Sequence, residues 1–329
     1  MTMSSISIRG RYAPSPTGTL HLGNLRTALL AWLFARSAGG AFILRMEDLD
    51  GPRVRPGAAE QILADLRWLG LEWDEGPDVD GPYGPYTQSA REAIYAAALA
   101  HLRRYDAIYP CYCTRAELRA LHTDENVASA PHGLSTSSPP ARYCSCRVLT
   151  SAERLACETS GRRPAWRFRA PPEPFTFTDR IMGTVTQRPS DAGDFIVWRS
   201  DGLFAYHLAV VVDDALMGVS QIVRGADLLP FVAAQRALFL ALGYPPPTEY
   251  AHVPLATDAT GVRMAKRDAS AGVAALRAHG VTPAQTLGAL AASCGLWPAN
   301  TPATPADLLV AFDPMRIIRE PSPIVLLEG

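Results

Sequence analysis

Two closely spaced pairs of cysteines could hold a metal ion. Cys111 and Cys113 form one C-x-C pair, Cys144 and Cys146 form the other, and a Pro/Ser-rich stretch separates them. Four thiolates in two pairs suit a closed tetrahedral zinc site. Ordinary buried thiols are the plainer alternative, and they are the role expected of the two remaining cysteines.

A loop that leads into a predicted helix could bind phosphate. Residues 11–24 read RYAPSPTGTLHLGN, and His21 and Gly23 fall where the loop enters the helix. The first turn of a helix presents unpaired N–H groups, and a glycine lets a ligand approach the backbone. The chain has neither GxGxxG nor GxxxxGK, which argues against dinucleotide dehydrogenases and P-loop NTPases. For His21 by itself, a histidine in a surface helix cap is the simpler interpretation.

A basic segment far along the chain is the second candidate for phosphate binding. It reads GVRMAKR at residues 261–267 and contains Lys266, the only lysine among 31 lysine and arginine residues. Arginine stays charged and binds oxyanions in a bidentate manner, whereas lysine is a compact point charge on a flexible stem. The position that keeps lysine is therefore a candidate for phosphate contact, although an isolated basic segment is more often a solvated turn.

The elements around the first loop predict a βαβ unit. Residues 6–13 alternate as a strand, leucines recur at helical spacing from His21 to Gly39–Gly40, and residues 41–46 form a short apolar strand that ends at Glu47. A strand, a helix and a second strand within about 40 residues are typical of a parallel sheet that binds ligands at the carboxyl ends of its strands.

Further elements follow from caps and apolar runs. Ser89 with Glu92 and Thr114 with Glu117 have the spacing of capping boxes. Residues 165–188 predict short strands of a β-rich insertion, and the apolar runs 203–212 and 219–223 predict buried parallel strands that complete the sheet. Beyond residue 267 the chain is rich in Ala and Leu, with Thr-Pro pairs at 282–283 and 304–305 that predict helix starts.

Length and composition set the class of protein. The chain has 329 residues, 48% of them hydrophobic and 19% charged, and a formal net charge of -1. These values are typical of a globular protein of about two domains. The sequence has no apolar run long enough for a membrane span and no secretory signal layout, so we expect a cytoplasmic protein and a monomer.

The two phosphate-binding candidates together resemble a known pair of motifs. HLGN and RMAKR resemble the HIGH and KMSKS motifs of class I aminoacyl-tRNA synthetases, and FILRMEDLD and GPYGPYTQS resemble the glutamyl branch of that family. The resemblance covers residues 11–267. Asn24 replaces the second histidine of the first motif. In the second motif Arg263 and Ala265 replace a lysine and a serine, whereas the lysine that contacts ATP is kept as Lys266.

The resemblance implies an α/β fold with a Rossmann-like nucleotide-binding domain and a parallel sheet. It implies an inserted α+β subdomain with zinc and a C-terminal helical segment. We therefore expect the catalytic domain in two halves, residues 1–108 and 191–257, with the insertion at 109–190. The KMSKS-like loop and the helical segment would occupy residues 258–329.

The resemblance also assigns the substrate sites. L-glutamate binding is assigned to Arg11, Tyr12, Ala13, Pro14, Ser15, Glu47, Tyr206 and Arg224. ATP binding, with Mg2+, is assigned to His21, Gly23, Asn24 and Lys266, of which His21 and Lys266 would be catalytic. The two motif loops are His21, Leu22, Gly23 and Asn24 and then Arg263, Met264, Ala265, Lys266 and Arg267. Guanidinium groups and a carboxylate are the donors and acceptor that an amino acid with two carboxylates needs.

The fourth zinc ligand has two candidates. The family pattern completes a C-x-C pair with a tyrosine and a cysteine, which favours Tyr143 and Cys146. Thiolate is the better zinc ligand, which favours Cys144 over Tyr143. The sequence leaves this choice open.

The RNA partner is suggested by the length of the chain after the second motif. Only 62 residues follow Arg267, too few for the anticodon-binding domain of a bacterial glutamyl-tRNA synthetase. This layout resembles the branch that activates glutamate without tRNA and attaches it to queuosine in the anticodon of tRNA(Asp). A truncated glutamyl-tRNA synthetase that charges a tRNA 3′ end and a non-catalytic regulatory paralogue are the alternatives. Seven arginines within residues 141–169 form a candidate phosphate-facing patch.

Overall fold

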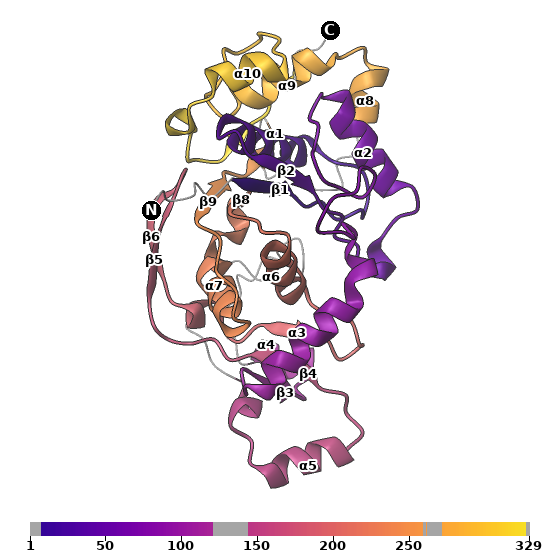
Figure 1. Cartoon of the computed structure of the whole chain (residues 1–329), viewed down its shortest axis with the longest axis vertical. Coiled ribbons are helices and arrows are strands. Elements are labelled where there is room, and N and C mark those ends of the chain that lie inside the picture. Colours follow the sequence, from indigo (N-terminus) through magenta and orange to yellow (C-terminus); the bar gives the residue numbers. More distant parts are fainter. Residues whose placement is uncertain (1–7, 121–143, 259–260, 262–271, 327–329) are drawn as a thin grey trace.

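The computed structural model describes residues 8–120, 144–258, 261 and 272–326 (Figure 1). Its largest sheet has the strand order β2-β1-β8-β9-β5-β6. The strands are β1 (Arg9–Tyr12), β2 (Ala41–Leu44), β5 (Phe175–Asp179), β6 (Gly183–Gln187), β8 (Gln221–Gly225) and β9 (Glu249–Val253). Every pair in this sheet is parallel except β5 with β6. The predicted α/β class with a parallel sheet is confirmed.

The predicted βαβ unit is also confirmed. Helix α1 (Leu22–Ser37) connects β1 to β2, and Arg9 and Tyr12 pair in register with Ala41 and Leu44. The helix packs closely on the sheet because β1 has a glycine at Gly10, where a Cβ atom would lie only 2.9 Å from the Cβ atom of Ala35. Since α1 is apolar on almost every side, the C-terminal helices cover the face that the sheet leaves free.

One predicted strand is a helix. Residues 203–212 were expected to form a buried parallel strand, whereas α6 (Tyr206–Leu216) begins within this run. The helix is buried from His207 to Asp214 and packs against α3 (Glu92–Arg104), α7 (Val232–Ala241) and β7 (Ile196–Trp198). A helix surrounded on all sides loses its polar face, so a short apolar run cannot distinguish it from a buried strand. The strand predicted at 219–223 is present as β8.

The strands predicted between residues 165 and 188 divide between two sheets. β3 (Ile108–Cys111), β4 (Ala165–Phe168) and β7 form a small antiparallel sheet, at the opposite end of the molecule from the C-terminal helices (Figure 1). The β5–β6 hairpin instead joins the large sheet beside β9. The domain boundaries at residues 109, 191 and 258 stay predictions.

The C-terminal segment is helical, as expected, and it pairs back onto the core. The Thr-Pro caps begin α9 (Pro283–Ala292) and α10 (Pro305–Ala311), each with a complete capping box. β10 (Ala256–Thr257) pairs in parallel with β11 (Ser322–Pro323). The remaining α-helices of the described residues are α2 (Ala58–Trp68), α4 (Arg115–Ala120), α5 (Ser151–Thr159) and α8 (Val273–Ala278). Among the described residues, no helix is long and apolar enough to cross a membrane.

The two other predicted capping boxes have different outcomes. Thr114 and Glu117 exchange the expected hydrogen bonds at the start of α4, at 2.6 and 3.2 Å. The prediction for Ser89 and Glu92 is wrong, because Arg91 is the N-cap of α3. The Ser89 hydroxyl and N–H donate instead to the carboxylate of Asp48, after strand β2. A long-range carboxylate thus competes successfully with the local cap.

Candidate functional site

His21 caps α1 and fixes its first turn. Nδ1 of His21 accepts a hydrogen bond from the N–H of Gly23 at 3.1 Å, and the side chain of Asn24 accepts one from the N–H of His21 at 3.3 Å. Because Nδ1 accepts, the neutral ring carries its proton on Nε2. Asn24 in the HLGN motif therefore has a local role, since its side chain completes the capping box.

Gly23 allows a close approach between α1 and the chain that leads to the basic segment. A Cβ atom at Gly23 would lie 3.0 Å from the ring of His21 and 3.1 Å from the Cβ atom of Ala256. His21 also forms an isolated β-bridge with Gly272. Both sequence flanks of the basic segment therefore meet the start of α1. The segment itself, Arg263, Met264, Ala265, Lys266 and Arg267, lies outside the described residues, so its contacts with ATP stay predictions.

A buried carboxylate holds the guanidinium group of Arg11 at the end of β1. Nε of Arg11 donates to both carboxylate oxygens of Asp214, at 3.2 and 3.3 Å, and Nη1 donates to the carbonyl of Val223 at 3.1 Å. Asp214 belongs to α6 and Val223 to β8, so contacts that are distant in sequence orient the side chain. Within the described residues Nη2 of Arg11 has no hydrogen-bond partner, which suits it to an anionic ligand.

Glu47 lies just beyond β2, close to the loop that begins at Ala13. Its N–H donates to the carbonyl of Pro14 at 2.9 Å, and its carboxylate accepts from Nη2 of Arg45 at 3.1 Å. Burial raises the pKa of Glu47 to about 7, and the charge of Arg45 opposes that shift only in part. Glu47 is therefore partly ionised near neutral pH, and an ammonium ligand would favour its charged form.

A buried charge network includes Arg11 and contacts Glu47. We use this name for Arg11, Arg45, Arg91, Asp213 and Asp214. Arg45 is fully buried and donates to Asp214 at 2.7 Å, and its Nε lies 3.5 Å from Asp213. Nε of Arg91 donates to Asp213 at 2.7 Å. Carboxylates thus compensate each cation, as buried charges require.

Arg224 is held by a second set of buried partners. Its Nε donates to Nε2 of His252 at 3.1 Å, and its Nη1 donates to the side-chain oxygen of Gln235 at 2.7 Å. Because arginine can only donate, Nε2 of His252 must accept, and the ring proton lies on Nδ1, 2.6 Å from a carboxylate oxygen of Asp179. Burial lowers the pKa of His252 to about 4, so the ring is neutral at physiological pH.

Tyr206 joins these groups from the first turn of α6. Burial and the charge of Glu47 raise the pKa of the Tyr206 hydroxyl to about 12, so it stays protonated. Arg224 and Arg11 are close enough to oppose this shift. The structure therefore brings together Arg11, Glu47, Tyr206 and Arg224, which the sequence assigned to one glutamate site.

The loop residues of the predicted glutamate site have local contacts within the loop and with the start of α1. Tyr12 is buried, and its hydroxyl donates to the carbonyl of Asn24 at 3.3 Å. The carbonyl of Ser15 accepts from Thr17 within the loop. Contacts of Tyr12, Ala13, Pro14 and Ser15 with glutamate stay predictions.

Sequence reasoning missed the residues that orient the predicted site. These are Arg45, Asp213, Asp214, Asp179, Gln235 and His252. A weak signal was available, because Arg45 and the Asp213-Asp214 pair interrupt strongly apolar runs. Charged residues are rarely buried without a partner, so such interruptions predict an internal ion pair. The partners themselves could not be identified without the tertiary structure.

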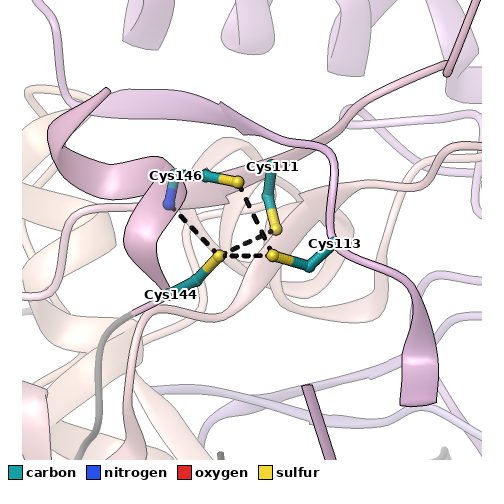
Figure 2. A group of neighbouring side chains, drawn as sticks. All are labelled: Cys111, Cys113, Cys144 and Cys146. Carbon is teal, nitrogen blue, oxygen red and sulfur yellow. Dashed lines mark hydrogen bonds between the residues drawn. The ribbon is translucent and has the colours of Figure 1, made fainter. Parts of the chain in front are cut away.

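The four cysteines of the C-x-C pairs form one cluster (Figure 2). Their sulfur atoms all lie within 4.8 Å of one another, and the Sγ of Cys144 is 2.9 Å from that of Cys113 and 3.5 Å from that of Cys111. A tetrahedral site with Zn–S bonds of about 2.3 Å would separate its sulfurs by about 3.8 Å. The cluster could therefore hold a metal ion. Cys144 belongs to it, whereas Tyr143 lies outside the described residues.

Backbone N–H groups donate to two of the clustered sulfurs, and the resolved pKa shifts of the cysteines have opposite directions. The N–H of Tyr112 donates to the sulfur of Cys146, and the N–H of Cys146 donates to the sulfur of Cys144, both at 3.4 Å. A hydrogen bond from Cys144 and the charge of Arg167 lower the pKa of Cys111 to about 5, against its burial. Burial raises the pKa of Cys113 to about 11, and the hydrogen bond to Cys111 together with burial raises the pKa of Cys144. Thiolate is the form that binds a metal, so four ionised cysteines at this place would need a cation to offset their mutual repulsion.

The predicted basic patch is only partly available at the surface. Arg147 donates to the carboxylate of Asp194 at 2.6 and 2.8 Å, and Arg167 donates to the carbonyl of the same residue. Arg162 and Arg163 are exposed. The remaining patch residues are Arg142, Arg154 and Arg169, of which Arg142 lies outside the described residues. Contact of this region with nucleic acid stays a prediction.

A family model agrees with the predicted resemblance. The model described as tRNA synthetases class I (E and Q), catalytic domain, matches residues 7–299. A solved glutamate tRNA ligase from Elizabethkingia meningosepticum, in complex with its amino acid, superposes with a TM-score of 0.78 at 29% sequence identity. The superposition covers 97% of this chain and 67% of that one.

Two similar relatives match over almost their full length. Glutamyl-Q tRNA(Asp) synthetase of Symbiobacterium thermophilum is 53% identical over 95% of this chain and 94% of its own. The protein of the same name from Nitratidesulfovibrio vulgaris is 51% identical over 97% of both chains. The chain therefore belongs to the class I tRNA synthetases for glutamate and glutamine and, within them, to the glutamyl-Q tRNA(Asp) synthetase family.

Proposed function

We propose that the protein activates L-glutamate with ATP, without needing tRNA, and transfers the glutamyl group to queuosine in the anticodon of tRNA(Asp). The observation that carries this proposal is the near full-length similarity to relatives of that name, at 53 and 51% identity. Similarity to a protein named glutamate–tRNA ligase 2, from Syntrophus aciditrophicus, is lower, at 44% identity over 58% of that protein.

The buried groups at the ends of β1, β2 and β8 support glutamate as the amino acid. Arg11 and Arg224 offer guanidinium groups for two carboxylates, and Glu47 offers a carboxylate for the ammonium group. Arg11 and Arg224 are held by partners on other elements, Asp214 and His252, and Glu47 is held by its near neighbour Arg45. A site whose groups are already oriented loses little freedom when the ligand binds.

The proposed reaction has two steps. An oxygen of the glutamate carboxylate attacks the α-phosphorus of ATP, an O–P bond forms, and the bond to pyrophosphate breaks. A queuosine hydroxyl then attacks the glutamyl carbonyl, AMP leaves, and the hydroxyl proton passes to solvent. Such chemistry depends on positioning and charge stabilisation rather than on a nucleophilic side chain. His21, with its proton on Nε2, would donate to the phosphates at the start of α1.

Two metal ions belong to the proposal. Mg2+ bound with ATP would neutralise the charge that develops on the leaving pyrophosphate. Zinc at Cys111, Cys113, Cys144 and Cys146 would have four protein ligands and no open position, which is typical of a structural site. Its role would be to hold η3 (Ser145–Val148) against β3 of the small sheet.

The function is tested with purified protein, labelled glutamate and ATP. We expect pyrophosphate exchange without tRNA, and label on tRNA(Asp) that contains queuosine but not on tRNA(Asp) that lacks it. Label on tRNA(Glu) would instead identify a glutamyl-tRNA synthetase. A protein without exchange in any mixture would be a non-catalytic paralogue.

A pair of substitutions tests the basic segment. Lys266→Arg is expected to lower the rate of pyrophosphate exchange far more than Arg263→Lys, because a compact ammonium must follow the phosphates through the reaction. Equal, near-normal exchange in both variants would remove the special role of Lys266.

A further inference from the structure

Arg26, in the second turn of α1, is a buried cation whose partners are all neutral. Its side chain is 1% exposed. Nη2 donates to the carbonyl of Pro254, and Nη1 donates to the hydroxyls of Ser322 at 2.8 Å and Ser293 at 3.3 Å. Within the described residues no carboxylate contacts it, and its Nε has no hydrogen-bond partner. The titratable group that acts on it is Cys294, whose pKa is raised by burial, so the thiol is neutral.

In both contacts with the serines, Arg26 must be the hydrogen-bond donor. The hydroxyl of Ser322 donates to the carbonyl of Ser293 at 2.8 Å, and the hydroxyl of Ser293 donates to the carbonyl of Leu290 at 2.7 Å. Because each hydroxyl donates its one hydrogen to a carbonyl, it can only accept a hydrogen bond from Arg26. An uncompensated cation in such a place costs stability, so stability alone does not account for it.

One partner of Arg26, Pro254, lies on the chain that enters the basic segment, and a second, Ser322, pairs with that chain. Pro254 lies two residues before the start of β10, and β10 pairs with β11 through Ala256 and Ser322. Gly272, the first described residue after the segment, forms a bridge with His21. The start of α1, from its N-cap His21 to Arg26, therefore contacts the chain on both sides of the basic segment, at Gly272 and at Pro254.

We propose that Arg26 is a positioning residue for ATP binding. It fixes β10 relative to His21, and through Ser322 and Ser293 it makes the C-terminal segment part of the support for the nucleotide site. A lysine could not bridge Pro254 and the two serines, because it lacks the planar fork of donors. This inference rests on the proposed function, since it concerns the nucleotide of that reaction.

The test compares Arg26→Lys with the matched control Arg36→Lys. Arg36 lies in the last turn of the same helix and pairs with Asp74 at 2.6 Å, away from β10. We measure, by calorimetry, the affinity for a non-hydrolysable ATP analogue and separately for glutamate, and we measure the KM for ATP in pyrophosphate exchange. Arg26→Lys should lower the affinity for the ATP analogue and raise the KM for ATP, each about 10- to 100-fold. A displacement of binding groups by about 1 Å has effects of this size. Glutamate affinity and the control should stay near the wild-type values.

A second variant keeps the test decisive if Arg26→Lys does not fold. Ser322→Ala removes one acceptor of Arg26 and retains the bond to Pro254. It should therefore lower the affinity for the ATP analogue about threefold and leave the affinity for glutamate unchanged. Equal losses for both ligands, or no loss for either, would overturn the inference. A wild-type protein that binds the analogue without any exchange would refute the proposed function and leave the test of Arg26 intact.

Discussion

The buried charge network and the cysteine cluster hold their ionisable groups in opposite ways. The network pairs Arg11, Arg45 and Arg91 with Asp213 and Asp214, on α6, so cations and anions alternate at 2.7 to 3.5 Å. The cluster brings four groups of one kind, thiols, together. The first is complete within the chain, whereas the second gathers groups that repel one another once they are ionised.

This difference separates two routes to a fixed geometry. Buried opposite charges stabilise each other only when every partner is present, so loss of one partner leaves the other uncompensated. Like groups need an external cation, and their stability then depends on its concentration. We expect the glutamate site to be formed by folding alone and the small sheet to depend on a metal.

The largest effect is expected from Asp214→Asn, which removes a charge and keeps the shape. Arg11 and Arg45 would lose their shared carboxylate, and breaking such a pair lowers the free energy of unfolding by about 3–5 kcal/mol. The KM for glutamate in pyrophosphate exchange should rise about 100-fold, because Arg11 would no longer be oriented. Urea denaturation of the variant and of the wild-type protein measures the change in the free energy of unfolding.

Asp213→Asn is the control for this prediction. Asp213 accepts from Gln88, Arg91 and Tyr95, so its loss should cost stability with a smaller effect on the KM for glutamate. Equal effects of the two substitutions on KM would show that the network is not specific for the pocket.

Metal removal is expected to have the next largest effect. A strong chelator should release one zinc ion per chain and lower Tm by about 5–10 °C, because metal binding contributes several kcal/mol to folding. Pyrophosphate exchange should persist, while transfer to tRNA should fall, since the cluster lies on the small sheet. Metal analysis of Cys144→Ala, Tyr143→Phe and the control Cys157→Ser identifies the fourth ligand. Retention of zinc by Cys144→Ala would favour Tyr143.

The smallest effect concerns the pH dependence of glutamate binding. The pKa of Glu47 is raised from 4.5 to about 7 in the folded protein, so its protonated form is favoured by folding. The stability contributed by protonated Glu47 is fully present below pH 4.5 and is lost as the pH rises towards 7. Binding of an ammonium group needs the ionised form, so the KM for glutamate should fall roughly tenfold between pH 6 and pH 8. Glu47→Gln should remove this dependence, and an unchanged profile in that variant would assign it to another group.

The sequence predicted the elements that depend on local pattern. The βαβ unit, β8 and the caps at Thr282 and Thr304 follow from periodicity and from side chains within a few residues of one another. The residues of α6 were predicted to be a strand, because a buried helix loses its polar face. A helix was predicted to start at Ser89, but Ser89 donates to Asp48 instead of to Glu92. Both errors arise where contacts between residues distant in sequence determine the local structure.

The sequence by itself determined which groups were available for chemistry: HLGN, the single lysine, two C-x-C pairs and the charged residues at strand ends. Only the tertiary structure decided how these groups are held. Asp214 lies more than 200 residues from Arg11, and Pro254 lies more than 200 residues from Arg26. His252 lies on a different strand from Arg224. Residue type and spacing fix chemical capacity within a segment. Burial and partners across segments fix the charge, orientation and proton position of each group, and these depend on the completed fold.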